Sequence, residues 1–232
     1  MSSRRDDLAS NLAAVRDRIA AAATAAGRAT DEVELVVVTK YFPPSDVDLL
    51  VDLGVRHIGE NKDQEARAKV DEIARRDAVT VHFIGQLQSN KVGHVAAYAD
   101  VVQSVDRPKI VRALDGAADR AERRLEVLVQ VALDGAGGRG GVALDEVDAL
   151  ADLVGESGHL DLRGVMAVAP RDGDPREAFA RLREVADGIR GRHREASWIS
   201  AGMSGDLEQA VAEGATHLRV GTAILGTRPP LG

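Results

Sequence analysis

VELVVVTKYFPPSDVDLLVDLG, residues 33–54, joins a short apolar run to an amphipathic pattern. Within the run 33–39, the residues LVVV at 35–38 are apolar on both faces, which is typical of a strand buried in a parallel sheet. Apolar residues then recur at helical spacing over 44–54, and this predicts a helix. The stretch is therefore one strand followed by one helix, with Lys40 at the end of the strand.

The same alternation continues along the chain. A helical crossover returns the chain to the same end of a sheet, so strands separated by helices must be parallel. The expected strands lie near 33–39, 56–59, 81–84, 101–104, 126–133, 162–168, 197–200 and 217–220. The helices that follow 44–54 are expected near 61–76, 88–98, 107–124, 143–156, 174–194 and 206–214.

These repeated units predict an α/β fold, a single (β/α)8 TIM barrel that spans residues 1–232 as one domain. An open, doubly wound sheet is the alternative, because buried parallel strands fit either architecture. An extra N-terminal helix precedes the first strand and is expected to end near Gly27. Its apolar residues recur at helical spacing, at Leu8, Leu12, Val15 and Ile19.

Composition narrows the classes of partner. The net charge of −7 provides no positive field to hold nucleic acid or an anionic membrane. The chain has no cysteine, which excludes disulfides, thiolate nucleophiles and cysteine-based metal sites. The histidines show no metal-ligand spacing, and His82 is interpreted as structural. No secretory signal and no membrane-spanning run is visible, so a cytoplasmic protein is expected.

Lys40 is the first candidate for chemistry. Active groups of a (β/α)8 barrel gather at the C-terminal ends of the strands, and Lys40 ends the first of them. A partly desolvated amine at that position forms a Schiff base with a carbonyl compound. The alternative is a solvated lysine at the rim, and the neighbouring residues leave both interpretations open.

Two turns after the last two strands predict a phosphate site. Small residues at 202–205 and 221–222 each stand between a strand and a helix. Barrels commonly bind phosphate at these two loops, where glycines permit close approach and backbone N–H groups are free. Ser204 and Thr222 each add a hydroxyl. The alternative is a pair of ordinary turns with Ser204 as a helix N-cap.

Three charged residues near these turns bear on that choice. Arg219 lies on the same side of its strand as Gly221, so it is expected inside the barrel. A buried arginine needs a partner, which is either an acid or a polar ligand beside the phosphate. Asp206 and Glu208 suit a helix N-terminus without a ligand, and they have to point away from a bound phosphate.

Motifs in the same order over nearly the whole chain carry a family resemblance. They are TK at 39–40, GEN at 59–61, HFIGQLQSNK at 82–91, GVMA at 164–167, GMSGDLEQAVAEGAT at 202–216 and RVGTAILG at 219–226. Together they resemble the pyridoxal phosphate homeostasis protein family, whose barrel is related to the N-terminal domain of alanine racemase. The lysine, the two turns and the strand-eight arginine are similar to a fold-type III pyridoxal phosphate site.

The resemblance implies a barrel that binds pyridoxal 5′-phosphate (PLP) as a Schiff base on Lys40. It implies a role for each remaining candidate: Ser204, Gly221 and Thr222 at the phosphate, Arg219 at the pyridine nitrogen, and Asn61 along the pocket. Two loops depart from the family pattern. Lys62 stands where many members have tyrosine, and Arg139 stands where many have lysine, so no role is carried over to either loop.

The resemblance further implies a regulator of intracellular vitamin B6 pools without established turnover, a carrier that hands PLP to PLP-dependent apoenzymes. Arg219 donates to a ring nitrogen but cannot protonate it fully, which makes the ring a poor electron sink. No second domain with a catalytic base is expected after the barrel. A minimal PLP-dependent amino-acid racemase is the alternative, and a sugar-phosphate enzyme without PLP is a third reading. The aromatic content of only 3% favours a monomer.

Overall fold

The computed structural model describes residues 3–133 and 140–227, so Arg139 lies outside the described residues. Within them, eight parallel strands pair in chain order and β8 pairs with β1, which closes the barrel. The predicted (β/α)8 barrel is confirmed and the open sheet is wrong. The strands are β1 (Glu34–Val38), β2 (His57–Glu60), β3 (Thr80–Phe83), β4 (Val101–Val105), β5 (Leu125–Gln130), β6 (Leu160–Met166), β7 (Trp198–Ser200) and β8 (His217–Val220).

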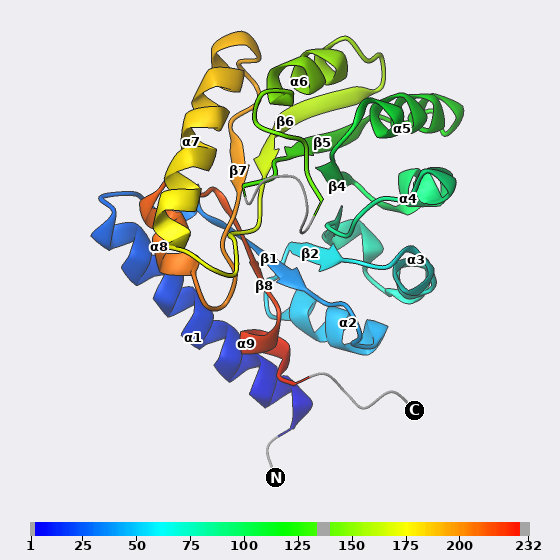
Figure 1. Ribbon diagram of the computed structural model, residues 1–232. Coiled ribbons are helices and arrows are strands. Elements are labelled where there is room, and N and C mark those ends of the chain that lie inside the picture. The colour runs from blue at the N-terminus through cyan, green and yellow to red at the C-terminus, as the bar shows by residue number, and fades with distance from the viewer. Residues whose placement is uncertain (1–2, 134–139, 228–232) are drawn as a thin grey trace.

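Helices surround the barrel as an outer layer (Figure 1). Those that follow the strands are α2 (Pro44–Asp52), α3 (Asp63–Glu72), α4 (Val92–Tyr98), α5 (Pro108–Arg120), α6 (Val147–Gly155), α7 (Pro175–Arg192), α8 (Leu207–Ala212) and α9 (Thr222–Leu225). Among the described residues, none of the helices has the length and apolar character needed to span a bilayer.

Three local differences from the predicted elements have simple causes. The helix expected over 61–76 ends at Glu72, because Ile73 is buried in an extended conformation with ψ 117°. The helix expected over 88–98 begins as a 3-10 turn, Ser89–Lys91, before α4. The short α9 is absent from the predicted elements, since four residues are too few to show a helical period.

The extra N-terminal helix α1 (Arg4–Ala25) covers the side of the barrel where α9 is short. Ser3 and Asp6 form a capping box at its start. Figure 1 shows α1 lying alongside α8 and α9, which it contacts. The four apolar residues that predicted this helix are all buried: Leu8, Leu12, Val15 and Ile19.

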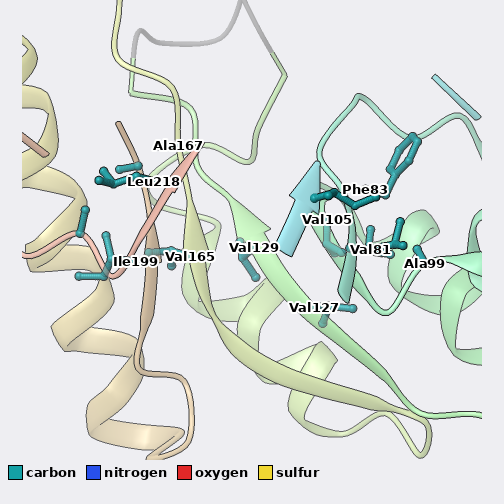
Figure 2. Close-up of a cluster of buried hydrophobic side chains, with 14 of the residues drawn as sticks. Val81, Phe83, Ala99, Val105, Val127, Val129, Val165, Ala167, Ile199 and Leu218 are labelled. Atoms are coloured by element: carbon teal, nitrogen blue, oxygen red, sulfur yellow. The ribbon is translucent and has the colours of Figure 1, made fainter. Parts of the chain in front are cut away.

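The barrel wall separates two interiors. Most buried apolar side chains lie between the strands and the helices, and Figure 2 shows part of this layer, with Val81, Phe83, Val127 and Val165 among the labelled residues. A small second cluster fills part of the barrel itself, formed by Val101, Leu128 and Met166. Polar side chains occupy the remaining interior of the barrel, and they matter for the site described next.

Candidate functional site at the C-terminal end of the barrel

Lys40 lies in the turn directly after β1, where the sequence predicted it, and its side chain is half-buried. Its Nζ is 5.8 Å from the centroid of the Tyr41 ring, and Lys62 Nζ is 5.3 Å from the same centroid. Tyr41 has φ 72°, a left-handed conformation that non-glycine residues adopt only when neighbours hold them there. The Tyr41 N–H donates to the carboxylate of Glu65 on α3, which fixes this turn.

A buried ion pair supports the Lys40 turn from below. Glu60 and Lys69 are both almost fully buried, and Lys69 Nζ lies 2.7 Å from Glu60 Oε1. Lys69 also donates to the Thr39 carbonyl at 2.7 Å, and the Thr39 hydroxyl donates to Glu60 at 2.6 Å. Sequence reasoning missed this pair. The visible signal is a charged residue at the end of a strand, in the GEN motif, with a lysine nine residues later.

Arg219 is buried inside the barrel with only 5% of its surface exposed. Its Nη1 donates to the Ser200 hydroxyl at 2.6 Å and its Nη2 donates to the Ala167 carbonyl at 2.7 Å. Among the described residues, no acid forms an ion pair with it, so the salt-bridge interpretation is wrong. Burial lowers the pKa of Arg219 to about 10, and it therefore remains protonated at neutral pH. A guanidinium has five donors, and the two bonds leave others for a ligand.

The two glycine turns lie after β7 and β8 on the same rim. A Cβ on Gly221 would lie 3.0 Å from the Val38 carbonyl oxygen, so glycine lets the end of β8 approach the end of β1 close to Lys40. Thr222 opens α9, where the first N–H groups of a helix have no partner within the helix. Ser204 lies half-buried in the turn after β7.

The acids of the β7 turn have partners of their own. Asp206 accepts a hydrogen bond from the Met203 N–H at 2.6 Å, and Glu208 pairs with Arg18 of α1 at 2.8 Å. Asp206, rather than Ser204, occupies the N-cap of α8, so the helix-cap interpretation of Ser204 is wrong. The Ser204 hydroxyl is thereby available to an anion in the turn.

Asn61 follows β2 and lines a cavity of about 260 Å³ together with Lys62, Phe83 and Gln86. A Cβ on Gly85 would lie 2.0 Å from the Asn61 carbonyl oxygen, so only glycine permits the loop after β3 to pack against Asn61. The structure brings Asn61, Lys40, Ser204, Gly221 and Thr222 to the C-terminal rim of one barrel, with Arg219 below them on β8.

These residues fit a phosphorylated aromatic aldehyde. A primary amine at the end of β1 suits the aldehyde, and free N–H groups with hydroxyls after β7 and β8 suit the phosphate. Arg219 is a buried donor that pairs with no carboxylate in the described part of the chain, which suits an unprotonated ring nitrogen between them. A closed (β/α)8 barrel with this combination defines the class of the alanine racemase N-terminal domain, and residues 10–229 match the family model described as "Alanine racemase, N-terminal domain".

Curated relatives narrow the class. The pyridoxal phosphate homeostasis protein of Mycobacterium tuberculosis is 45% identical over an alignment of 243 positions, gaps included, that covers 97% of this chain and 94% of the relative. The protein of that name from Escherichia coli K12 is 38% identical over 228 residues, which cover 96% of this chain and 97% of the relative. The chain belongs to the pyridoxal phosphate homeostasis protein family.

Solved structures agree with this assignment. PipY of Synechococcus elongatus with PLP bound has a TM-score of 0.82 at 30% identity, covering 94% of this chain and 100% of PipY. Alanine racemase from Corynebacterium glutamicum has a TM-score of 0.69 at 14% identity, covering 98% of this chain and 62% of the racemase. The second likeness is one of fold alone.

Proposed function

We propose that this chain binds PLP reversibly at the C-terminal end of the barrel and acts in PLP homeostasis as a carrier. The observation that carries the proposal is the buried, protonated Arg219, which forms no ion pair with an acid among the described residues and lies on the strand that ends at the Gly221 turn. The names of the relatives and the PLP-bound structure of PipY support it. The site residues are those that the sequence predicted: Lys40, Asn61, Ser204, Arg219, Gly221 and Thr222.

Different residues bind different parts of the ligand. PLP supplies an aldehyde that condenses reversibly with a primary amine and releases one water. Lys40 provides that amine, from a turn that is held by Glu65 and by the Glu60–Lys69 pair at the C-terminal end of β1. The turns after β7 and β8 bind the phosphate through N–H groups and hydroxyls. Arg219 donates a hydrogen bond to the ring nitrogen.

Titration of the purified protein with PLP tests the proposal by visible absorption, followed by borohydride reduction and peptide mapping. We expect an absorption band and a reduced adduct on Lys40, both lost in Lys40→Ala. Lys62→Ala is the matched control, because both amines lie over the Tyr41 ring. It should keep the band and the adduct. An adduct on Lys62, or no band in the unsubstituted protein, would contradict the proposal.

We further propose that the protein does not turn over amino acids and that it delivers PLP to apoenzymes. Arg219 keeps its own proton at neutral pH, so it donates a hydrogen bond to the ring nitrogen without transferring the proton. A ring whose nitrogen is unprotonated withdraws electrons weakly. Incubation of the PLP-loaded protein with L-alanine, followed by chiral chromatography, tests this point. We expect no more D-alanine than Lys40→Ala produces. D-alanine that depends on Lys40 would establish a racemase instead.

A further inference from the structure

A row of hydrogen bonds leads away from Arg219 through the interior of the barrel. Arg219 Nη1 donates to Ser200 Oγ at 2.6 Å, and Ser200 Oγ donates to Gln103 Oε1 at 2.7 Å. Gln103 Nε2 lies 2.8 Å from His82 Nδ1. Ser200 on β7 and Gln103 on β4 are not neighbours in the wall, so their bond crosses the barrel. Ser200, Gln103 and His82 are each 0% exposed.

The row continues to the N-terminal end of the barrel. His82 Nε2 lies 3.0 Å from His57 Nδ1, and His57 Nε2 lies 3.8 Å from Glu34 Oε2. His57 is half-buried and Glu34 is exposed. Both line a cavity of about 400 Å³ between α1 and the starts of β1 and β2. One end of the row therefore meets solvent, and the other ends at the proposed site of the ring nitrogen.

Arg219 sets the direction of every bond in the row. A guanidinium only donates, so Ser200 Oγ accepts from it and turns its own proton to Gln103 Oε1. The Gln103 amide then presents its NH2 to His82, which makes His82 Nδ1 the acceptor. His82 carries its proton on Nε2 and donates it to His57 Nδ1. All donors point from Arg219 toward the N-terminal end.

We propose that Ser200, Gln103 and His82 are positioning residues that hold Arg219 against the ring of the bound ligand, and that protonation of His57 at the opposite end weakens this hold. The inference rests on the proposed function. It adds a structural link from the N-terminal end of the barrel, where Glu34 is exposed, to the ligand at the C-terminal end. It also assigns the buried polar residues between them a role beyond packing.

Protonation of His57 conflicts with the direction of the row. A proton on His57 Nδ1 would face the Nε2–H of His82, so two donors would meet across 3.0 Å. Relief requires His82 and the Gln103 amide to reverse. Ser200 Oγ would then accept from both Gln103 and Arg219, and its own proton would lose its acceptor. The hydrogen bond from Arg219 to Ser200 is thereby weakened.

The charged surroundings of His57 come from several elements. Glu34 on β1 favours its protonation, whereas the adjacent Arg56 opposes it. His82 on β3 and His217 on β8 face the ring, with centroids at 5.2 and 6.4 Å. Arg16 and Asp17 of α1 line the same cavity. Burial is the largest effect and lowers the pKa of His57, so the ring is neutral at neutral pH.

Ser200→Ala tests the positioning role. Loss of a hydrogen bond to a charged group should raise the dissociation constant for PLP about tenfold. Ser200→Thr retains the hydroxyl and should restore most of the affinity. The matched control is Ser104→Ala, because Ser104 is equally buried and its Oγ has no hydrogen-bond partner among the described residues. Equal affinity in Ser200→Ala and Ser104→Ala would overturn the proposal.

A second measurement needs neither a variant nor PLP. Nitrogen-15 spectra of the histidine-labelled protein report which ring nitrogen of each histidine carries the proton. We expect His82 to be protonated on Nε2 alone, at neutral pH and without ligand. A proton on His82 Nδ1 would overturn the row even if Ser200→Ala failed to fold. Failure of the unsubstituted protein to bind PLP would instead refute the proposed function, so the two failures are distinguishable.

The link to His57 is tested by the pH dependence of PLP binding. In His57→Asn, the Asn Oδ1 replaces the Nδ1 acceptor but does not titrate. As pH falls, the dissociation constant of the unsubstituted protein should rise more steeply than that of His57→Asn. Any effect of protonating Lys40 is common to both proteins and cancels in the comparison. Parallel curves would overturn the link.

Discussion

Glu60 and Lys69 show how single residues prepare the Lys40 turn. Each would be costly to bury alone, and burial raises the pKa of Glu60 despite its bonds to Lys69 and Thr39. The second carboxylate oxygen of Glu60 has no hydrogen-bond partner among the described residues. The buried Glu60 carboxylate therefore depends on Lys69 for charge compensation. Because Lys69 also donates to the carbonyl of Thr39, next to Lys40, the pair stabilises the turn that carries Lys40.

Removal of one partner of the Glu60–Lys69 pair should strongly destabilise the folded protein. We expect Lys69→Met to lower the free energy of unfolding by about 3–5 kcal/mol, because it leaves the Glu60 carboxyl buried without its cation. Urea denaturation measures this. The control is Arg75→Met, which breaks the exposed Arg75–Asp52 pair at 2.6 Å. That change should cost less than about 1 kcal/mol. Similar losses in both variants would contradict the assigned role of Lys69.

His217 makes the folded state sensitive to acid. Burial lowers the pKa of His217 to about 3, whereas the unfolded chain takes up the proton near 6.5. Between these values the unfolded state binds more protons, so the stabilising contribution is complete above pH 6.5 and declines below it. The decline is about 1.4 kcal/mol per pH unit. Glu60 titrates in the opposite sense, because burial raises its pKa.

Comparison with His217→Phe isolates this residue. The centroids of the His217 and Trp198 rings lie 4.3 Å apart. A phenylalanine ring can fill the space of the His217 ring and does not titrate. Unfolding free energies of both proteins are measured by urea denaturation from pH 7 downward. Below pH 6.5 the unsubstituted protein should lose stability faster than the variant, by about 1.4 kcal/mol per pH unit. Equal slopes would show that His217 does not carry this sensitivity.

At the scale of elements, α1 completes the outer layer of the barrel. It packs on α8 and α9, the latter only four residues long, and its buried face is made of leucine, valine, isoleucine and alanine. Two ion pairs add attachments, Arg4 with Asp46 on α2 and Arg18 with Glu208 on α8. The helix thus belongs to the core of the domain although it precedes the first strand.

Truncation within this face measures the contribution of α1. Leu12 is 1% exposed, and Leu12→Ala should lower the free energy of unfolding by about 2–5 kcal/mol through the cavity that it leaves. Arg5→Ala on the exposed face of the same helix is the control, expected to change stability by about 0.5 kcal/mol or less. Loss of α1 packing without global destabilisation would show that the barrel folds independently of it.

At the scale of the whole molecule, we propose that the protein is a monomer in solution. Among the described residues, the exposed large apolar side chains are Leu144 and Met203, which do not form the apolar centre of a stable interface. We expect sedimentation velocity to give one species near 24.6 kDa, with or without PLP. A species of twice that mass at micromolar concentration would contradict this expectation.

The alternation of apolar runs and helical patterns predicted the barrel that the structure confirms, and the ends of the strands indicated which residues to propose for the ligand site. Local periodicity reports which residues are buried, and a parallel barrel places strand ends on one rim whatever the details of packing. Lys40, Ser204, Arg219, Gly221 and Thr222 were candidates by their positions at strand ends and turns, whereas Asn61 was implied by the family resemblance alone, and all six remain proposals.

Only the tertiary structure decided the partners of the buried polar groups. Gln103 and Ser200 are separated by 97 positions, and Glu60 and Lys69 lie on different elements. No local pattern encodes such pairs, because their contact depends on how the barrel closes and on which faces the strands turn inward. The direction of the row from Arg219 to His57 arises from the same closure, since each donor is assigned by its neighbour across the interior.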